Sequence, residues 1–586
     1  MKNLLAVILL FAFLSAEPHP EAIKSAQNII QVFSHQSSKS HISDDLRTLA
    51  RYGHSLSENT KHELRLLGFN FGGRIVNRSL DVRTEASGLN DTYDNGNFRF
   101  HYTTSGSHAV SSSDTNSNSI PDYIEQMSAV FNHVVDYQLN MFDFVEPPAD
   151  GWYTAINDNG GNGLYDIYVR NAGGGVYGYV QPEFYANNSG NNEHSSGVIE
   201  VNAFTSYMVM RHNYNGFPNT ELEAIKVTAA HEFFHAVQFG YDGWEESWVM
   251  EATAVQMEEI VYDDVNDCYQ YMSSWFNSPH QSLNLDSQNR WYGSFIFFEY
   301  VNTHLSEEAI REFWEQSITH DSYYGEYSVQ TLDEAFDDLG SSFAEMLNGM
   351  SVANRIMSSS SAAAPFDYEE ADTYSDTDTL STYNTVSYST GTDETVTSTN
   401  LQENAAQYIR LTSDDPVLAT LTNDDGPDSY LELHAIMTYG DSAWTVWSGS
   451  PINIDPTDAT QVYFVVVSQN DAGSSFGYTL TFSDGAMSTD PEIPDKFSIS
   501  HAYPNPFNPQ TNIQIDLQNP QRVQVYIYDI NGQMVKTLVN RHLVAGQHVF
   551  TWNGRNYQGH PVSTGTYFVR IKGKSQERWQ KVTLLK

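Results

Sequence analysis

Cysteine and basic residues are both scarce in this sequence. Its 586 residues include a single cysteine, Cys268, and only 29 lysines and arginines against 73 aspartates and glutamates. The formal net charge of −44 argues against nucleic acid or an anionic membrane as a partner, because both repel an acidic protein. Without disulfides, large hydrophobic cores or bound metal ions must hold an exported chain together. The length is too great for one core and predicts about three or four domains.

Long hydrophobic runs are missing as well. The apolar run from Leu4 to Leu14 is too short to span a bilayer, and no later stretch is long enough. Lys2 precedes this run and Ser15-Ala16 follows it, which predicts a signal peptide over residues 1–16. We therefore expect a mature chain without a transmembrane span that is secreted or attached to the cell surface.

The segment from Thr220 to Gly240 is predicted to form one helix. Thr220 and Glu223 have the spacing of a capping box, and Gly240 is expected just past the helix end. Within this helix the chain reads His231-Glu232-Phe233-Phe234-His235. Histidines four residues apart project from one face, so both imidazoles can bind one metal ion.

This spacing is the zincin signature and predicts Zn²⁺ as the cofactor. Glu232 would act as the general base, taking a proton from a zinc-bound water. A zinc hydrolase needs a third protein ligand, and Glu251 in the next expected helix is our candidate, with a surface carboxylate as the alternative. Tyr292 is a candidate donor to a developing oxyanion, although a buried tyrosine of the core is the alternative role.

A second candidate metal site is the stretch from Asp114 to Glu125. Laid on the twelve-residue calcium loop, six residues supply oxygen ligands: Asp114, Asn116, Asn118, Ile120 through its carbonyl, Asp122 and Glu125. Ser119 replaces the usual glycine, and Pro121 is unusual inside such a loop. The stretch predicts Ca²⁺ binding, with a solvated turn rich in Asp and Asn as the alternative.

The domain order follows from helical and strand patterns. Short helical patterns from Glu21 to Leu67 are followed by mixed patterns, then by strands that recur at short intervals between turns. We predict a multidomain chain: an N-terminal lead-in or prosegment (17–85), an α+β zincin-like metalloprotease domain (86–357), a Ser/Thr/Asp-rich linker (358–400), an all-β sandwich accessory domain (401–487), a second linker (488–497) and a C-terminal immunoglobulin-like β-sandwich (498–586).

The last of these domains resembles the C-terminal sorting domain of type IX secretion substrates. The resemblance rests on YPNPFNP from Tyr503, YDINGQ from Tyr528, WNGRNYQG from Trp552, GTYFVRI from Gly565 and the ending KVTLLK. That domain is similar in turn to an immunoglobulin-like domain of flagellar hook-capping proteins. The resemblance implies a Gram-negative source and the type IX secretion machinery as a partner.

Residues from Phe98 to Ile356 resemble a family of secreted bacterial metalloproteases. The matching stretches are SNSIPDYIE, GGNGLYDIYV, GGVYGYVQPE, TAAHEFFHAVQFGYD and WVMEATAVQMEE. The resemblance implies His231 and His235 as zinc ligands, Glu232 as the general base and Glu251 as the third ligand, as in gluzincins. Ala252 stands where a glycine is common after that glutamate, and the gap from His235 to Glu251 is shorter than in many gluzincins.

Together these patterns predict a secreted zinc endopeptidase that acts on a protein or peptide substrate. A second hypothesis is a calcium-stabilised, non-catalytic surface or adhesin-like protein. Metal content separates the two, because the second hypothesis predicts calcium without stoichiometric zinc.

Overall fold

The computed structural model describes residues 18–585 apart from 35–40, 70–86, 149–159, 187–198, 319–327, 375–379, 486–497 and scattered gaps of one to three residues. The predicted signal peptide (1–16) and second linker (488–497) lie outside the described residues. The chain divides into two compact units, Met1–Trp244 and Glu245–Lys586, so the predicted domain 86–357 is split between them. In the described part of the chain, no helix is long and apolar enough to cross a membrane.

A five-stranded sheet lies at the centre of the first unit, in the order β1-β2-β3-β5-β4. β2, β3 and β5 run parallel to one another, whereas β1 and β4 pair antiparallel at the two edges. The strands are β1 (Asp91–Asn95), β2 (Phe98–Tyr102), β3 (Tyr165–Arg170), β4 (Gly178–Tyr185) and β5 (Phe204–Arg211).

Helices cover both faces of this sheet. Successive side chains of a strand point to opposite faces, so each strand packs against the helices on both sides. On one face, Phe98 contacts Phe131 and Phe233, with ring centroids 5.1 and 5.4 Å apart. These two residues lie on α4 (Asp122–Val135) and α5 (Glu221–Gln238); a π-helical turn, η4 (Asp136–Met141), continues α4. On the other face, Tyr168, Tyr179 and Val209 share a core with the N-terminal helices.

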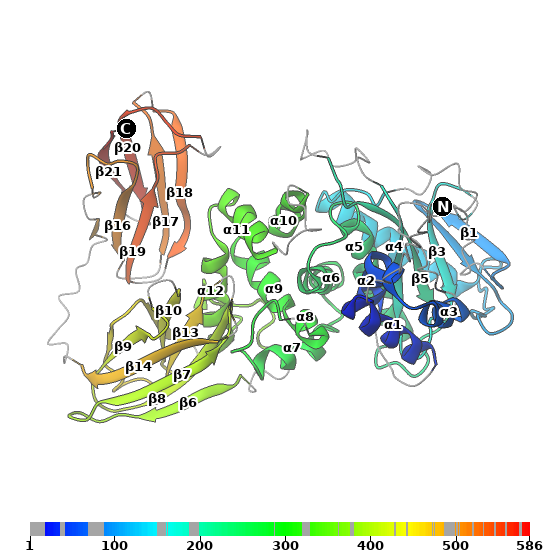
Figure 1. Ribbon diagram of the computed structural model, residues 1–586, viewed down its shortest axis with the longest axis horizontal. Coiled ribbons are helices and arrows are strands. Elements are labelled where there is room, and N and C mark those ends of the chain that lie inside the picture. The colour runs from blue at the N-terminus through cyan, green and yellow to red at the C-terminus, as the bar shows by residue number, and fades with distance from the viewer. Residues whose placement is uncertain are drawn as a thin grey trace, which may run out of the picture. The chain divides into compact units, whose positions relative to one another are not determined.

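The N-terminal helices are integral to the first unit. They are α1 (Pro20–Phe33), α2 (Ser43–Tyr52), the 3₁₀ turn η1 (Gly53–Ser55) and α3 (Glu58–Leu66), and Figure 1 shows them in blue beside the sheet. Ile29, Leu46 and Leu64 are fully buried in the shared core. The short helices expected between Glu21 and Leu67 are confirmed, and they pack on the sheet through apolar stripes of helical spacing.

The second unit begins with seven helices among its described residues. They are α6 (Ser247–Val261), α7 (Tyr269–Phe276), α8 (Gln288–Gly293), α9 (Phe295–His304), α10 (Ala309–Ser317), α11 (Ser328–Asp338) and α12 (Phe343–Ile356). α6 and α9 are buried along most of their length, and Trp248 of α6 stacks on Phe298 of α9 with ring centroids 6.0 Å apart.

A β-sandwich follows these helices. One sheet has the order β11-β10-β13-β8-β6 and the other β12-β9-β14-β7, and their inner faces share one core. The strands are β6 (Thr382–Ser387), β7 (Glu394–Leu401), β8 (Ala405–Thr412), β9 (Val417–Asn423), β10 (Leu431–Thr438), β11 (Trp444–Ser448), β12 (Ile452–Ile454), β13 (Gln461–Ser468) and β14 (Phe476–Asp484).

The predicted linker 358–400 is wrong in its second half, because β6 and most of β7 come from it. Val386, Val396 and Leu401 are buried in the sandwich core, while most of the residues between them are exposed Thr, Ser, Asp and Glu. The polar outer face of two strands therefore has the composition of a linker.

The C-terminal domain is a second sandwich, with sheets β15-β16-β19 and β18-β17-β20-β21 around one core. Its strands are β15 (Ser498–Ile499), β16 (Thr511–Leu517), β17 (Gln521–Tyr528), β18 (Met534–Leu543), β19 (Gly546–Trp552), β20 (Gly565–Lys572) and β21 (Glu577–Leu584). The prediction of a multidomain chain that combines a mixed α and β region with C-terminal β-sandwiches is confirmed at this level.

Candidate metal centre

Helix α5 carries the predicted site. Its N-terminus has the expected capping box: the Thr220 hydroxyl accepts from the Glu223 backbone N–H, and the Glu223 carboxylate accepts from the Thr220 N–H at 2.9 Å. The helix ends at Gln238, and Gly240 follows the cap residue Phe239. A Cβ at Gly240 would lie 3.0 Å from the Val237 carbonyl oxygen and 3.2 Å from Val145, so close packing accounts for this glycine.

His231 and His235 lie one turn apart on α5 and are buried, with 0% and 2% of their surfaces exposed. Their ring centroids are 4.7 Å apart and the rings are perpendicular, at 89°. His235 Nδ1 is 2.7 Å from Gln238 Oε1. Because an amide oxygen can only accept, Nδ1 carries the proton and Nε2 keeps the lone pair that a metal ion requires.

Aromatic residues of the same helix fix its rotation. Phe233 contacts Phe98 and Tyr165 of the sheet, and Phe234 meets Phe144 edge to face with centroids 5.0 Å apart. His231, Glu232 and His235 lie on the same two turns of the helix as Phe233 and Phe234 but point in other directions around its axis. Core packing of the phenylalanines therefore positions the polar side chains of the site.

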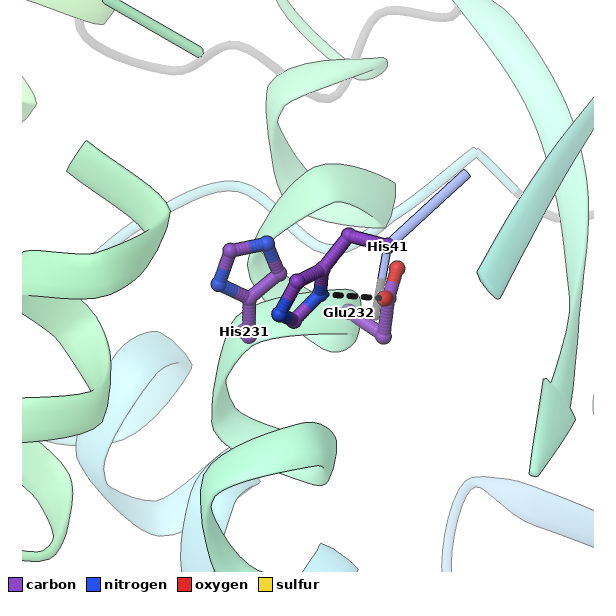
Figure 2. Close-up of side chains that lie close together, drawn as sticks. All are labelled: His41, His231 and Glu232. Atoms are coloured by element: carbon purple, nitrogen blue, oxygen red, sulfur yellow. Dashed lines mark ion pairs between the residues drawn. The ribbon is translucent and has the colours of Figure 1, made fainter. Parts of the chain in front are cut away.

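Glu232 contacts the N-terminal segment through both carboxylate oxygens. Ser43 Oγ donates to Oε2 at 2.7 Å, and His41 Nδ1 lies 3.6 Å from Oε1. The His41 ring also lies 4.6 Å from the ring of His231. Figure 2 shows the His41 imidazole between His231 and Glu232, with one nitrogen facing the carboxylate. All of these side chains are at most 8% exposed.

The pKa of Glu232 reflects this environment. Full burial by itself would raise the pKa, but the contact with His41 and the nearby His231 and His235 outweigh burial and hold the pKa below its ordinary value. The carboxylate is therefore ionised, which is the form in which a carboxylate serves as a base.

The donor set fits zinc. Two buried imidazoles on one helix face, one of them held by an amide oxygen in the tautomer that leaves Nε2 unprotonated, are ligands that Zn²⁺ prefers. His41, His231 and Glu232 also offer ligand atoms that lie within 4.8 Å of one another. The buried site thus concentrates nitrogen and oxygen donors at one turn of α5.

The remaining predicted residues of this site belong to the second unit. Glu251 lies on α6 and is 1% exposed, so a surface carboxylate is excluded. Its assignment as the third zinc ligand stays a prediction. Tyr292 lies on α8, is 8% exposed and stacks on Tyr271 with ring centroids 5.0 Å apart. This stacking gives it a packing role, and its oxyanion role stays a prediction.

The predicted calcium loop is a surface turn that binds its own polar groups. Asp114 accepts from the backbone N–H groups of Asn118 and Ser119, and Asn116 donates to Glu125. Ser119 takes the position of the usual glycine with a positive φ of 74°. Asp122 accepts from Ser113 and Thr115, which holds its pKa below the ordinary value. The loop has the expected sharp turn, and Ca²⁺ binding stays a prediction.

Sequence reasoning missed His41, Ser43 and Gln238. His41 and Ser43 lie about 190 residues before Glu232 in a stretch with no chemical pattern, so no local signal identifies them. Gln238 was detectable in principle, because a side chain three residues after His235 lies on the same helix face.

Comparison with known proteins finds similarity in the C-terminal domain. Residues 504–577 match the family model of the FlgD Ig-like domain. The chain is 39% identical over 62 residues to the basal-body rod modification protein FlgD of Salmonella typhimurium, and equally to that of Salmonella typhi. These 62 residues are 10% of this chain and 27% of each relative, so the chain spans about a quarter of the length of the curated relatives it matches. The family match thus lies in the C-terminal domain, outside helix α5.

Proposed function

We propose that this chain is a secreted zinc-dependent endopeptidase with a zincin-like catalytic region. The observation that supports this best is the arrangement on α5, where two buried histidines with perpendicular rings lie one turn apart and the buried Glu232 follows the first of them. A fold that needed only packing would gain nothing from burying three ionisable side chains together, because burial of polar groups costs free energy unless they are partnered.

In this proposal His231 and His235 hold the ion, and Glu251 keeps its predicted role as the third ligand. When bound, zinc supplies Lewis acidity to the reaction. Glu232 takes the proton of the attacking water and passes it to the leaving amine nitrogen of the peptide. Gln238 keeps His235 in the required tautomer through its 2.7 Å contact.

The C-terminal domain has a separate role in the proposal. We infer that residues 498–586 direct export through type IX secretion, on the strength of the YPNPFNP to KVTLLK stretches. The match to an Ig-like domain of flagellar proteins supports a β-sandwich module there. Calcium in the loop from Asp114 to Glu125 is part of the same proposal, as a stabilising ion outside the active site.

The proposal is tested by metal content and proteolysis. Purified full-length chain is assayed for zinc and calcium by elemental analysis, then for hydrolysis of denatured casein with and without a zinc chelator, in calcium throughout. We expect one zinc per chain and activity that the chelator abolishes and added zinc restores. Calcium without stoichiometric zinc, and no hydrolysis, would contradict the proposal and favour a calcium-stabilised surface protein.

A further inference from the structure

The N-terminal segment contacts both carboxylate oxygens of Glu232. A general base must contact the water whose proton it takes. Here the Ser43 hydroxyl donates to Oε2, and the His41 imidazole faces Oε1 and lies over the His231 ring. A hydroxyl donor on a carboxylate oxygen ties up a lone pair, and an imidazole beside a metal ligand fills space that water and substrate would otherwise use.

Residues 41–43 are also attached to the edge of the sheet. β4 is the last strand in the sheet order, so a segment outside the sheet can pair with its outer edge. His41 forms a parallel bridge with Gly178, the first residue of β4, and the Val180 N–H donates to Ser43 Oγ at 3.0 Å. The Ser43 hydroxyl thus links the edge strand to the predicted general base.

Contacts on the C-terminal side hold this segment in place. Ser43 is the first residue of α2, and Arg47 on the next turn donates to the Gly243 carbonyl at 3.3 Å. Leu46 and Leu49 of α2 are buried in the core that the N-terminal helices share with the sheet. The segment is therefore anchored by a hydrophobic core and contacts Glu232 through the side chains of His41 and Ser43.

We propose that residues 41–43 are an internal inhibitor of the peptidase proposed above. The inference rests on that proposed function and concerns the regulation of the same site. In the described arrangement His41 and Ser43 hold the general base, and hydrolysis requires that both side chains withdraw from Glu232. The N-terminal helices then serve to keep the enzyme latent.

The test compares three full-length, zinc-loaded proteins with equal zinc content. They are the wild type, the double variant His41→Ala with Ser43→Ala, and the control Ser57→Ala. Ser57 caps α3 in the same N-terminal segment by accepting from the Thr60 N–H, so its loss disturbs the segment without touching Glu232. Initial rates on a quenched fluorescent casein and the dissociation constant of a peptide hydroxamate are measured for each.

We expect the double variant to show at least a tenfold higher kcat/KM than the wild type and at least tenfold tighter hydroxamate binding. Ser57→Ala should stay within twofold of the wild type in both. A thermal melt establishes that the double variant is folded; if it is not, Ser43→Ala alone carries the test, because it removes one hydroxyl oxygen.

Three results would overturn the inference. Equal rates and equal hydroxamate binding in all three proteins would be consistent with the proposed peptidase but would refute the inhibitory role of residues 41–43. A lower rate in the double variant would make His41 and Ser43 positioning residues of the catalytic site. Absence of both zinc binding and hydrolysis in every variant would instead refute the proposed function, and the inhibitor with it.

Discussion

Two buried histidine–carboxylate pairs in the first unit differ in their geometry. His101 Nε2 and Asp166 Oδ1 are 2.8 Å apart, on the neighbouring strands β2 and β3. The His101 ring also stacks on Tyr168, with centroids 4.5 Å apart. His41 Nδ1 and Glu232 Oε1 are 3.6 Å apart, and the same carboxylate accepts from Ser43 and has His231 and His235 as neighbours.

The difference separates a pair that holds a fold together from one that can change partners. A direct hydrogen bond between two side chains of one sheet compensates the cost of burying both, and the surrounding strands leave no reason for it to open. The Glu232 carboxylate instead has a hydroxyl and several imidazoles as neighbours, so it can lose one of these contacts and keep another. We therefore expect the pair His101–Asp166 to act in stability, and Glu232 keeps the role of general base in the proposed function.

The largest expected effect of a single substitution is on turnover. Glu232→Gln keeps the shape of the side chain but removes its basicity, so kcat should fall by about 10²–10⁴-fold while zinc content and fold are retained. Casein hydrolysis, zinc analysis and a thermal melt on the same preparation check this. Substantial activity in a zinc-loaded Glu232→Gln protein would assign the base to another residue.

Asp166→Ala should lower stability and leave turnover unchanged, the opposite of Glu232→Gln. Removing one partner of a buried pair leaves the other uncompensated, so the free energy of unfolding should fall by about 3–5 kcal/mol. Activity per folded, zinc-loaded molecule should stay near the wild-type value, because the pair does not contact Glu232. Urea unfolding gives the first quantity and active-site titration with a hydroxamate the second. If Asp166→Ala instead lost turnover without loss of stability, the two pairs would not differ as argued.

Gln238→Ala tests the orientation of the metal ligands. Without the amide oxygen at Nδ1, His235 loses the partner that selects its tautomer, and zinc affinity should fall by about 10–100-fold. Competition with a chromogenic zinc chelator measures the affinity. Gln238→Glu is the matched control, since it keeps an acceptor oxygen at the same position and should bind zinc close to wild-type affinity.

The local part of the site was predictable from sequence, and the rest was not. Capping by Thr220 and Glu223, and two histidines on one helix face, depend only on residues within one helix, and both are found as expected. Contacts of Glu232 with His41 and Ser43 depend on how α2 docks on the edge of the sheet, across 189 residues for Ser43. No local periodicity or residue spacing in the sequence predicts how α2 docks on the sheet.

The boundaries of the β-sandwich show a second limit of sequence reasoning. β6 buries one of its six side chains and β7 three of eight, so composition alone assigned both strands to a linker. Their strand character comes from pairing with β8 and β14, which are distant partners in the fold. Edge strands with one solvent-exposed face are therefore easily mistaken for linkers when only composition is considered.

The smallest expected effect concerns a half-buried carboxylate, Glu259, which has acidic neighbours instead of imidazoles. Glu259 of α6 accepts from the Cys268 thiol at 2.9 Å, and burial together with Glu370 and Glu299 raises its pKa from 4.5 to about 9. Between these values the folded state holds a proton that the unfolded state releases, so the free energy of unfolding falls as the pH rises through this interval. Glu259→Gln keeps an acceptor for the thiol and cannot ionise. Because water screens a half-buried carboxylate, the effect is smaller than the full pKa shift implies, and the substitution should stabilise the chain at pH 8 by on the order of 1 kcal/mol, with no stabilising effect at pH 4. Urea unfolding at the two pH values measures the difference, and equal effects at both would show that Glu259 is ionised in the folded chain.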